Sequence, residues 1–292
     1  MKNLLFSLLE DSFGALFGSA ETIALAAEVN PGELSERDCK RYYGILMTAL
    51  LHGKDYATAI TTYQEALGSY PKAAEHIHEE GLTAYYFTRQ YQQGREAGSH
   101  CSDFGSLRGA YYYAVCQDMT GQYGPALTGL QAYSSSMRGD RPEDFDYHLG
   151  RCLLYAPASA AERTTRSMQA VEALTRYLAA IGKDAPADLV LMRMEGLYGA
   201  GNYALCINDA SQWLERNPGS GLAYLLRGKA RLRLNETAGA KADFTQAVAL
   251  GVSGHPTLTT ADARKLLTPV ARGAAGQKKA SAATQTSTKA YR

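Results

Sequence analysis

Apolar and small residues recur along the chain in blocks that predict helices, and no segment shows the regular apolar–polar alternation of a half-buried strand. Two long blocks share one pattern, K-D-Y-A-T-A-I-T-T-Y-Q-E-A-L-G-S-Y-P, ending at Pro71, and G-N-Y-A-L-C-I-N-D-A-S-Q-W-L-E-R-N-P, ending at Pro218. In both, a small residue follows the first Tyr by three positions and a Pro follows it by fifteen. A third copy of the beginning, T-G-Q-Y-G-P-A-L, starts at Thr120. The pattern predicts a chain of repeated helical units.

These units resemble the tetratricopeptide repeat (TPR), a helix–turn–helix unit of about 34 residues whose two helices are named A and B. In that family small residues lie where A and B approach, and a larger residue fills the space against the next unit. The unit starting at Gly221 has Gly228, Ala240 and Phe244 at such positions. The resemblance implies an all-α fold, a TPR-type α-solenoid in which antiparallel helix pairs form a right-handed superhelix.

The repeats divide the chain into four parts. Residues 1–39 are expected to form a degenerate N-terminal helical cap or half-matched repeat, and residues 40–254 about six TPR-like helix pairs. Those pairs are expected to begin near Lys40, Glu75, Leu107, Glu143, Ala187 and Gly221. The unit near Glu143 has about eight extra residues, which predict a lengthened turn between its helices. Residues 255–270 are expected to form a capping helix, and 271–292 a disordered basic tail.

The charge of the chain is nearly balanced, with 30 Lys and Arg against 29 Asp and Glu. Seven basic residues and no acidic one follow Asp262, so the rest of the chain has 23 basic and 29 acidic side chains, a formal charge near −6. A mildly acidic body without a repeated pair of base-reading residues argues against an RNA-reading helical repeat. No nucleic-acid partner is therefore expected.

The five cysteines are widely spaced and odd in number, which fits neither a zinc ribbon nor a disulfide framework and indicates a reducing compartment. Cys116, Cys152 and Cys206 fall at small packing positions of the repeat, which favours a structural role. Glu10 and Asp11 interrupt the apolar N-terminal run, which argues against a signal peptide. No uncharged stretch reaches the roughly 18 residues of a membrane span. A cytoplasmic protein without a membrane span is expected.

Motifs for catalysis or metal binding are missing from the sequence: it has no G-x-S-x-G, H-E-x-x-H or phosphate-binding loop. His76 and His78 are two residues apart, so on a helix they point in different directions and make a poor chelate. We interpret them as part of a solvated helix face. The sequence therefore predicts a protein that is not an enzyme and needs no cofactor or metal.

Function is expected on the concave groove that the A helices line in TPR proteins. The groove candidates combine tyrosines with charged residues: Tyr86, Tyr111, Tyr147, Arg151, Glu195, Tyr198 and Lys229. Tyr offers a large contact area with a polar tip, which suits peptide recognition, although the same rings could simply pack between neighbouring A helices. The leading hypothesis is a scaffold or co-chaperone-like adaptor that binds a peptide or protein subunit in this groove. The alternative is a structural subunit of a multiprotein complex, and an enzyme or ligand sensor is a third hypothesis.

Overall fold

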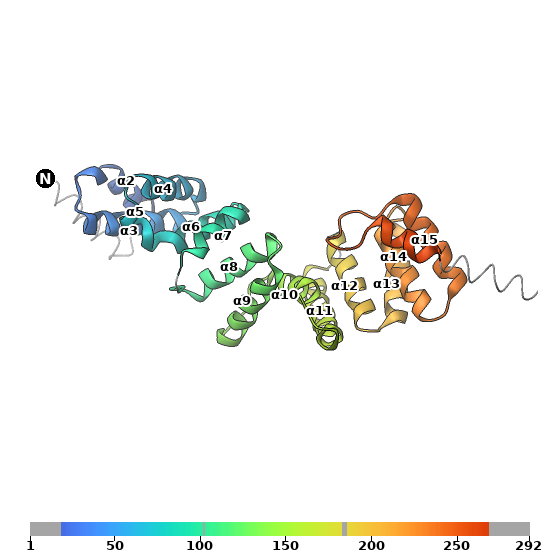
Figure 1. Ribbon diagram of the computed structural model, residues 1–292. Helices are drawn as coiled ribbons and strands as arrows, with labels where there is room; N and C mark the ends of the chain where they lie inside the picture. The colour runs from blue at the N-terminus through green and yellow to red at the C-terminus, as the bar shows by residue number, and fades with distance from the viewer. Residues whose placement is uncertain (1–18, 102, 183–185, 269–292) are drawn as a thin grey trace, which may run out of the picture. The chain divides into compact units, whose positions relative to one another are not determined.

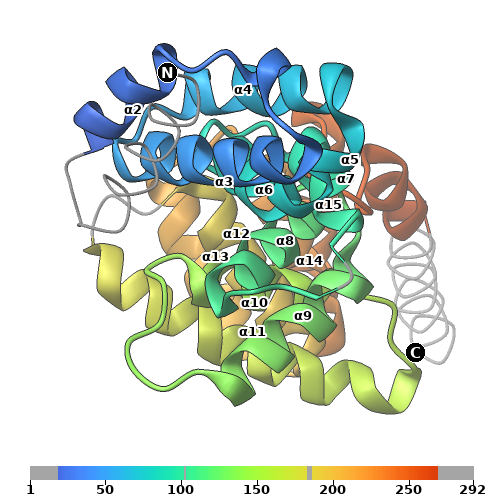
Figure 2. The same cartoon turned by 90° about the vertical axis from the view of Figure 1, so that its left-hand side faces the viewer.

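A computed structural model of the chain describes residues 19–101, 103–182 and 186–268, and within them the regular structure is helical with no strand. The chain divides into two compact units, Met1–Pro142 and Glu143–Arg292, and helices fill both of them (Figures 1 and 2). The beginning of the expected N-terminal cap and the whole expected tail, residues 271–292, lie outside the described residues.

Unit 1 contains three helix pairs. Its described part begins with α2 (Ser19–Ala27) and the short 3-10 helix η1 (Pro31–Glu33). The pairs are α3 (Glu36–His52) with α4 (Tyr56–Ser69), α6 (His78–Phe87) with α7 (Tyr91–Ser99), and α8 (Leu107–Met119) with α9 (Tyr123–Ser136). Two short helices, α5 (Pro71–Ala74) and η2 (Glu75–Ile77), lead into α6. The boundary expected at residue 40 falls inside α3, because the Ser35 hydroxyl accepts a hydrogen bond from the Asp38 N–H and caps the helix earlier.

Unit 2 also contains three helix pairs. They are α10 (Phe145–Tyr155) with α11 (Ala160–Ile181), α12 (Ala187–Gly199) with α13 (Tyr203–Arg216), and α14 (Gly221–Arg233) with α15 (Thr237–Leu250). Helix α12 packs on both α10 and α14, so the A helices are neighbours. Residues 260–268 form a further helix.

The extra residues of the α10–α11 pair extend the second helix rather than the turn. Helix α11 is 22 residues long and begins at Ala160, four residues after Ala156. Ser159 and Glu162 form a reciprocal capping box, which satisfies the first backbone N–H groups and starts the helix there. The expected long turn is therefore wrong.

In the other five pairs the turn between the helices has one conformation. A residue with φ between 59° and 81° precedes helix B by two positions: Lys54, Arg89, Gly121, Gly201 and Asn235. The next residue then donates its N–H to the carbonyl five residues back, as Asp55 does to Leu50 at 2.9 Å. This left-handed residue and its hydrogen bond close helix A before helix B begins.

The small residues of the repeat pattern lie where the helices approach. Their side chains are completely buried: Ala59, Ala126, Cys206 and Ala240. A Cβ added to Gly228 would lie 2.7 Å from a ring atom of Phe244, so only glycine fits there without displacing the ring. The start residues Ala187 and Gly221 of α12 and α14 are the predicted ones.

Candidate functional site

The side of α10 that faces α12 carries Tyr147, Arg151 and Tyr155, which share one face because they are four residues apart. At one end, the Tyr147 hydroxyl donates to Asp188 Oδ2 at 3.0 Å. At the other end, the Tyr155 hydroxyl donates to Glu195 Oε2 at 3.1 Å. Two hydrogen bonds thus connect this face of α10 with α12.

The same surface continues from α12 to α14. Glu195 and Tyr198 are one turn apart on α12, and the Lys229 ammonium of α14 lies 4.6 Å from the centroid of the Tyr198 ring. Burial lowers the pKa of Lys229, while the carboxylates of Glu195 and Asp262 act in the opposite direction. Cations in this position over an aromatic ring contribute about 0.5–2 kcal/mol.

We name this surface of unit 2 the A face. Its members are Tyr147, Arg151, Tyr155, Glu195, Tyr198 and Lys229. It brings together all of the predicted groove residues of unit 2 and adds Tyr155 to them.

The chain that leaves α15 returns over the A face, and we name residues 252–258 the crossing segment. The loop that follows α15 reaches back toward α12 (Figure 1). The His255 side chain is only 5% exposed, and its Nε2 lies 2.7 Å from Glu195 Oε2. Its ring packs edge-to-face on Tyr155, with centroids 5.7 Å apart. Val252 and Leu258, on either side of His255, pack against the apolar core between α12 and α14.

The hydrogen bonds of His255 determine which ring nitrogen carries the proton. Nδ1 accepts from the backbone N–H groups of Thr257, at 3.1 Å, and Leu258, at 2.8 Å. A nitrogen that accepts from two N–H donors has no proton of its own. The imidazole is therefore neutral, and its Nε2–H donates to Glu195.

The sequence did not indicate Tyr155 or His255 as site residues, and it placed a helix over 255–270. Among the described residues of that range, 255–268, the helix covers 260–268 and begins later than residue 255, because Gly251 and Gly254 have φ values of 78° and 73° and Pro256 follows His255. The G-V-S-G-H-P run was the available signal, since two glycines and a proline within six residues predict a turn.

The two remaining predicted residues, Tyr86 and Tyr111, lie in unit 1. Tyr111 is 1% exposed and packs against Tyr133, with ring centroids 5.2 Å apart, which makes it a core residue of this structure and not an open contact. Tyr86 is half-buried and stacks on Tyr112 with centroids 4.1 Å apart. The rings of Tyr112 and Tyr133 both lie against Tyr111, and its position in the repeat alone did not reveal this packing.

Tyr86 belongs to a group of rings in unit 1 that we name the aromatic cluster: Tyr56, Tyr86, Phe87 and Tyr112. Phe87 stacks on Tyr56 with centroids 4.6 Å apart and remains 45% exposed. An exposed Phe beside other rings is a feature of interaction surfaces.

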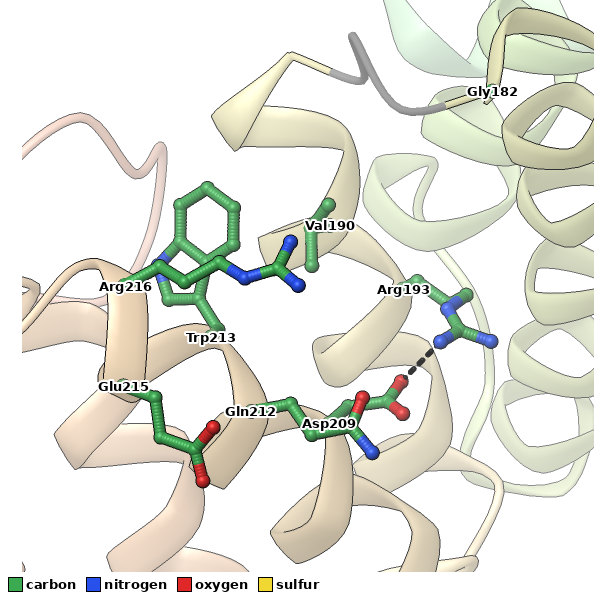
Figure 3. A pocket seen from close by; sticks show the side chains of 8 residues that line it. All are labelled: Gly182, Val190, Arg193, Asp209, Gln212, Trp213, Glu215 and Arg216. Atoms are coloured by element: carbon green, nitrogen blue, oxygen red, sulfur yellow. Dashed lines mark ion pairs between the residues drawn. The ribbon is translucent and has the colours of Figure 1, made fainter.

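A pocket of about 480 Å³ in unit 2 is lined by residues of α12 and α13 and by Gly182, which follows α11 (Figure 3). Arg193 and Asp209 form an ion pair of 2.6 Å at its wall, and the Arg216 side chain extends past Trp213 toward Val190. Burial raises the pKa of Asp209, while the charge of Arg193 opposes the rise. Arg193 and Asp209, the basic and the acidic side chain of this wall, are therefore already paired with each other.

Two further searches cover the part of the chain that the structure describes. There, no group of three or more His, Cys, Asp or Glu side chains could hold a metal ion. No helix of these residues is long and apolar enough to cross a membrane.

Comparisons with known proteins find similarity in fold alone. No protein-family model matches the chain, and no curated protein matches it. A tetratricopeptide repeat protein from Parabacteroides merdae is 13% identical, with a TM-score of 0.42, over 92% of this chain and 98% of its own. A chain of the APC/C hetero-tetramer Cut9–Hcn1 is 12% identical, with a TM-score of 0.46, over 90% of this chain and 55% of its own.

A third structure, the C-terminal part of a TPR repeat-containing protein from Cytophaga hutchinsonii, is 16% identical, with a TM-score of 0.41, over 72% of this chain and 78% of its own. Similarity at this level carries no information about ligands. The helix pairs of this chain are of the TPR type. The common turn, the buried small residues and the predicted starts of α12 and α14 are the features of the chain itself that agree with this fold.

Proposed function

We propose that this protein is a non-catalytic interaction scaffold that binds a short non-helical segment of a partner protein on the A face. One observation carries the proposal: the A face already holds a non-helical segment of the chain, because Glu195 and Tyr155 contact the inserted side chain of His255. A surface that orders a piece of the chain through inserted side chains has the properties that recognition of a peptide requires.

The chemistry of the A face supports binding of a polar peptide with apolar anchors. Tyr155 and Tyr198 combine ring surface with a hydroxyl, and Glu195 and Lys229 supply one charge of each sign. Such a mixture gives orientation and selectivity through its polar groups and affinity through its rings. The finer expectation of a cytoplasmic, co-chaperone-like adaptor without nucleic-acid partner or cofactor stays a prediction.

A structural subunit of a larger complex is the second candidate, and the aromatic cluster of unit 1 favours it. Phe87 and Tyr56 form an apolar surface on unit 1, whereas the A face belongs to unit 2. A protein that uses unit 1 to join a complex would need no displaceable ligand on the A face.

Photo-crosslinking from single positions separates these functions. We would place benzoylphenylalanine at Tyr198 on the A face, at Phe87 in the aromatic cluster, and at Leu205 on α13 as a control, since that side chain is 56% exposed. The scaffold proposal predicts that position 198 yields a defined adduct with one partner in extracts of the source cells. Adducts from position 87 alone support the subunit function, and equal adducts from all three positions contradict a specific A face.

A further inference from the structure

We infer that the crossing segment is an internal copy of the ligand, and that the A face recognises partner segments of the form His-Pro-x-aliphatic. The inference rests on the proposed function, and it specifies the chemistry of the segment that the A face binds. The model for that segment is His255-Pro256-Thr257-Leu258.

Histidine satisfies both sides of this contact, because one ring nitrogen donates while the other accepts. Glu195 Oε2 accepts a hydrogen bond from Nε2–H, and the backbone N–H groups of Thr257 and Leu258 donate to Nδ1. Lys or Arg could pair with Glu195 but has no acceptor for the two backbone groups, whereas a carboxylate could accept but not donate. The segment therefore needs a neutral imidazole rather than a basic side chain, because Nε2–H binds Glu195 of the A face while Nδ1 holds the turn of the segment itself.

The residues after the histidine shape the segment for this contact. Pro256 has no N–H and a restricted φ, which favours the turn that brings the next two N–H groups to the imidazole. Leu258 then packs on the core between α12 and α14, which makes it a second anchor three residues after the first. The two anchors, His255 and Leu258, are three residues apart, and this spacing defines the motif His-Pro-x-aliphatic.

The crossing segment has few anchors, which makes it displaceable. Ser253, Gly254, Pro256 and Thr257 are exposed, so between Val252 and Leu258 only His255 is inserted into the surface. A tethered segment acts at an effective concentration of the order of millimolar. An external ligand competes with the crossing segment for the A face. Its apparent affinity is therefore its intrinsic affinity multiplied by the fraction of molecules in which the A face is free.

A direct test uses the full chain and a fluorescent peptide of residues 250–260, L-G-V-S-G-H-P-T-L-T-T, with fluorescence anisotropy as the readout. His255→Ala weakens the internal segment, so we expect the peptide to bind this variant at least about tenfold more tightly than the unchanged chain. His52→Ala, at an exposed histidine at the end of α3, is the matched control and should bind like the unchanged chain. Leu258→Ser loosens the other anchor and serves as a second variant where His255→Ala unfolds.

Peptide variants test the predicted chemistry. Replacing the peptide histidine by Ala should abolish measurable binding to the His255→Ala chain, and replacing it by Lys should weaken binding at least about tenfold. A Lys peptide that binds as tightly as the His peptide would overturn the requirement for an imidazole. If the peptide binds the unchanged chain and both loosened variants equally, the inference that the crossing segment is an internal copy of the ligand is wrong. The same holds if the peptide binds none of the three.

The two proposals can fail separately. If no peptide binds a folded His255→Ala chain while position 198 still crosslinks one partner, the crossing segment is a fixed part of the fold and the scaffold function stands. If the peptide binds as expected but no partner crosslinks at position 198, the A face recognises the motif and the scaffold function loses its support.

Discussion

At the scale of single residues, His78 shows how this fold uses a histidine as a core residue. Its Nδ1 lies 2.6 Å from the Tyr63 hydroxyl, and the residue is 9% exposed. Burial raises the pKa of Tyr63, so the phenol keeps its proton beside the imidazole. Burial, followed by the charge of His100, lowers the pKa of His78 below its ordinary value. The interpretation of His78 as part of a solvated helix face is therefore wrong.

This arrangement predicts that the protein loses stability in weak acid. Unfolded His78 takes up a proton near pH 6.5, whereas the folded imidazole stays neutral to lower pH. The unfolded state thus binds more protons below about pH 6.5, and the free energy of unfolding falls by up to about 1.4 kcal/mol per pH unit for one such group. Urea unfolding at about pH 7.5 and 5.5 measures the loss.

His78→Gln removes the titrating group and should reduce the loss of stability between the two pH values, while His52→Gln, at an exposed position, should not. Equal pH dependence in the two variants would contradict the role given to His78.

The sequence was informative about residues whose position in the repeat decides their burial. Cys116 and Cys206 occupy small packing positions and are completely buried, and burial raises the pKa of each thiol to about 12. The sequence was uninformative where a short change of helix type altered the direction in which a side chain points. The short 3-10 helix Glu75–Ile77 precedes α6, so His78 faces α4 and not the solvent.

At the scale of elements, the repeat depends on one turn and one close approach. The turn needs a residue with positive φ, which this chain supplies with Gly, Asn, Lys or Arg. Because the residue type varies, the turns were hard to recognise from the sequence. The helices that follow two of them were recognisable, since Tyr56 and Tyr203 are their first residues. The close approach is that of α14 and α15 at Gly228.

A pair of glycine substitutions tests the close approach. Gly228→Ala should lower the free energy of unfolding by about 1–3 kcal/mol, because the new methyl group would clash with the buried Phe244 ring. Gly68→Ala, in α4, has nothing within 4 Å of the new methyl group and should stabilise the protein by up to about 1 kcal/mol through helix propensity. Thermal or urea unfolding monitored by circular dichroism measures both. Two changes of the same sign would contradict the packing described for α14 and α15.

Helix starts were predictable from the repeat at Leu107, Ala187 and Gly221. The extra residues before Arg163 were placed in a turn because they are small and polar. The Ser159–Glu162 capping box decides otherwise, since it supplies the hydrogen bonds that begin α11.

At the scale of the whole molecule, two compact units carry different surfaces. The predicted groove residues divide between them: Tyr86 and Tyr111 in unit 1, and the others on the A face of unit 2. Repeat positions could identify side chains on A helices, but not the segment that covers them. His255 meets Tyr155 across 100 residues of sequence, and no local pattern encodes a contact of that range.

Hydrogen exchange at single amides of the unchanged full chain tests the central claim, that His255 holds the crossing segment on the A face. The account predicts slow exchange at Thr257 and Leu258, whose N–H groups donate to the imidazole, and fast exchange at the exposed neighbours Ser253 and Gly254. Glu195→Ala, which removes the acceptor of the imidazole proton, should raise exchange at Thr257 and Leu258 without changing the amides of unit 1. Equally fast exchange at all four amides of the unchanged chain would contradict the account.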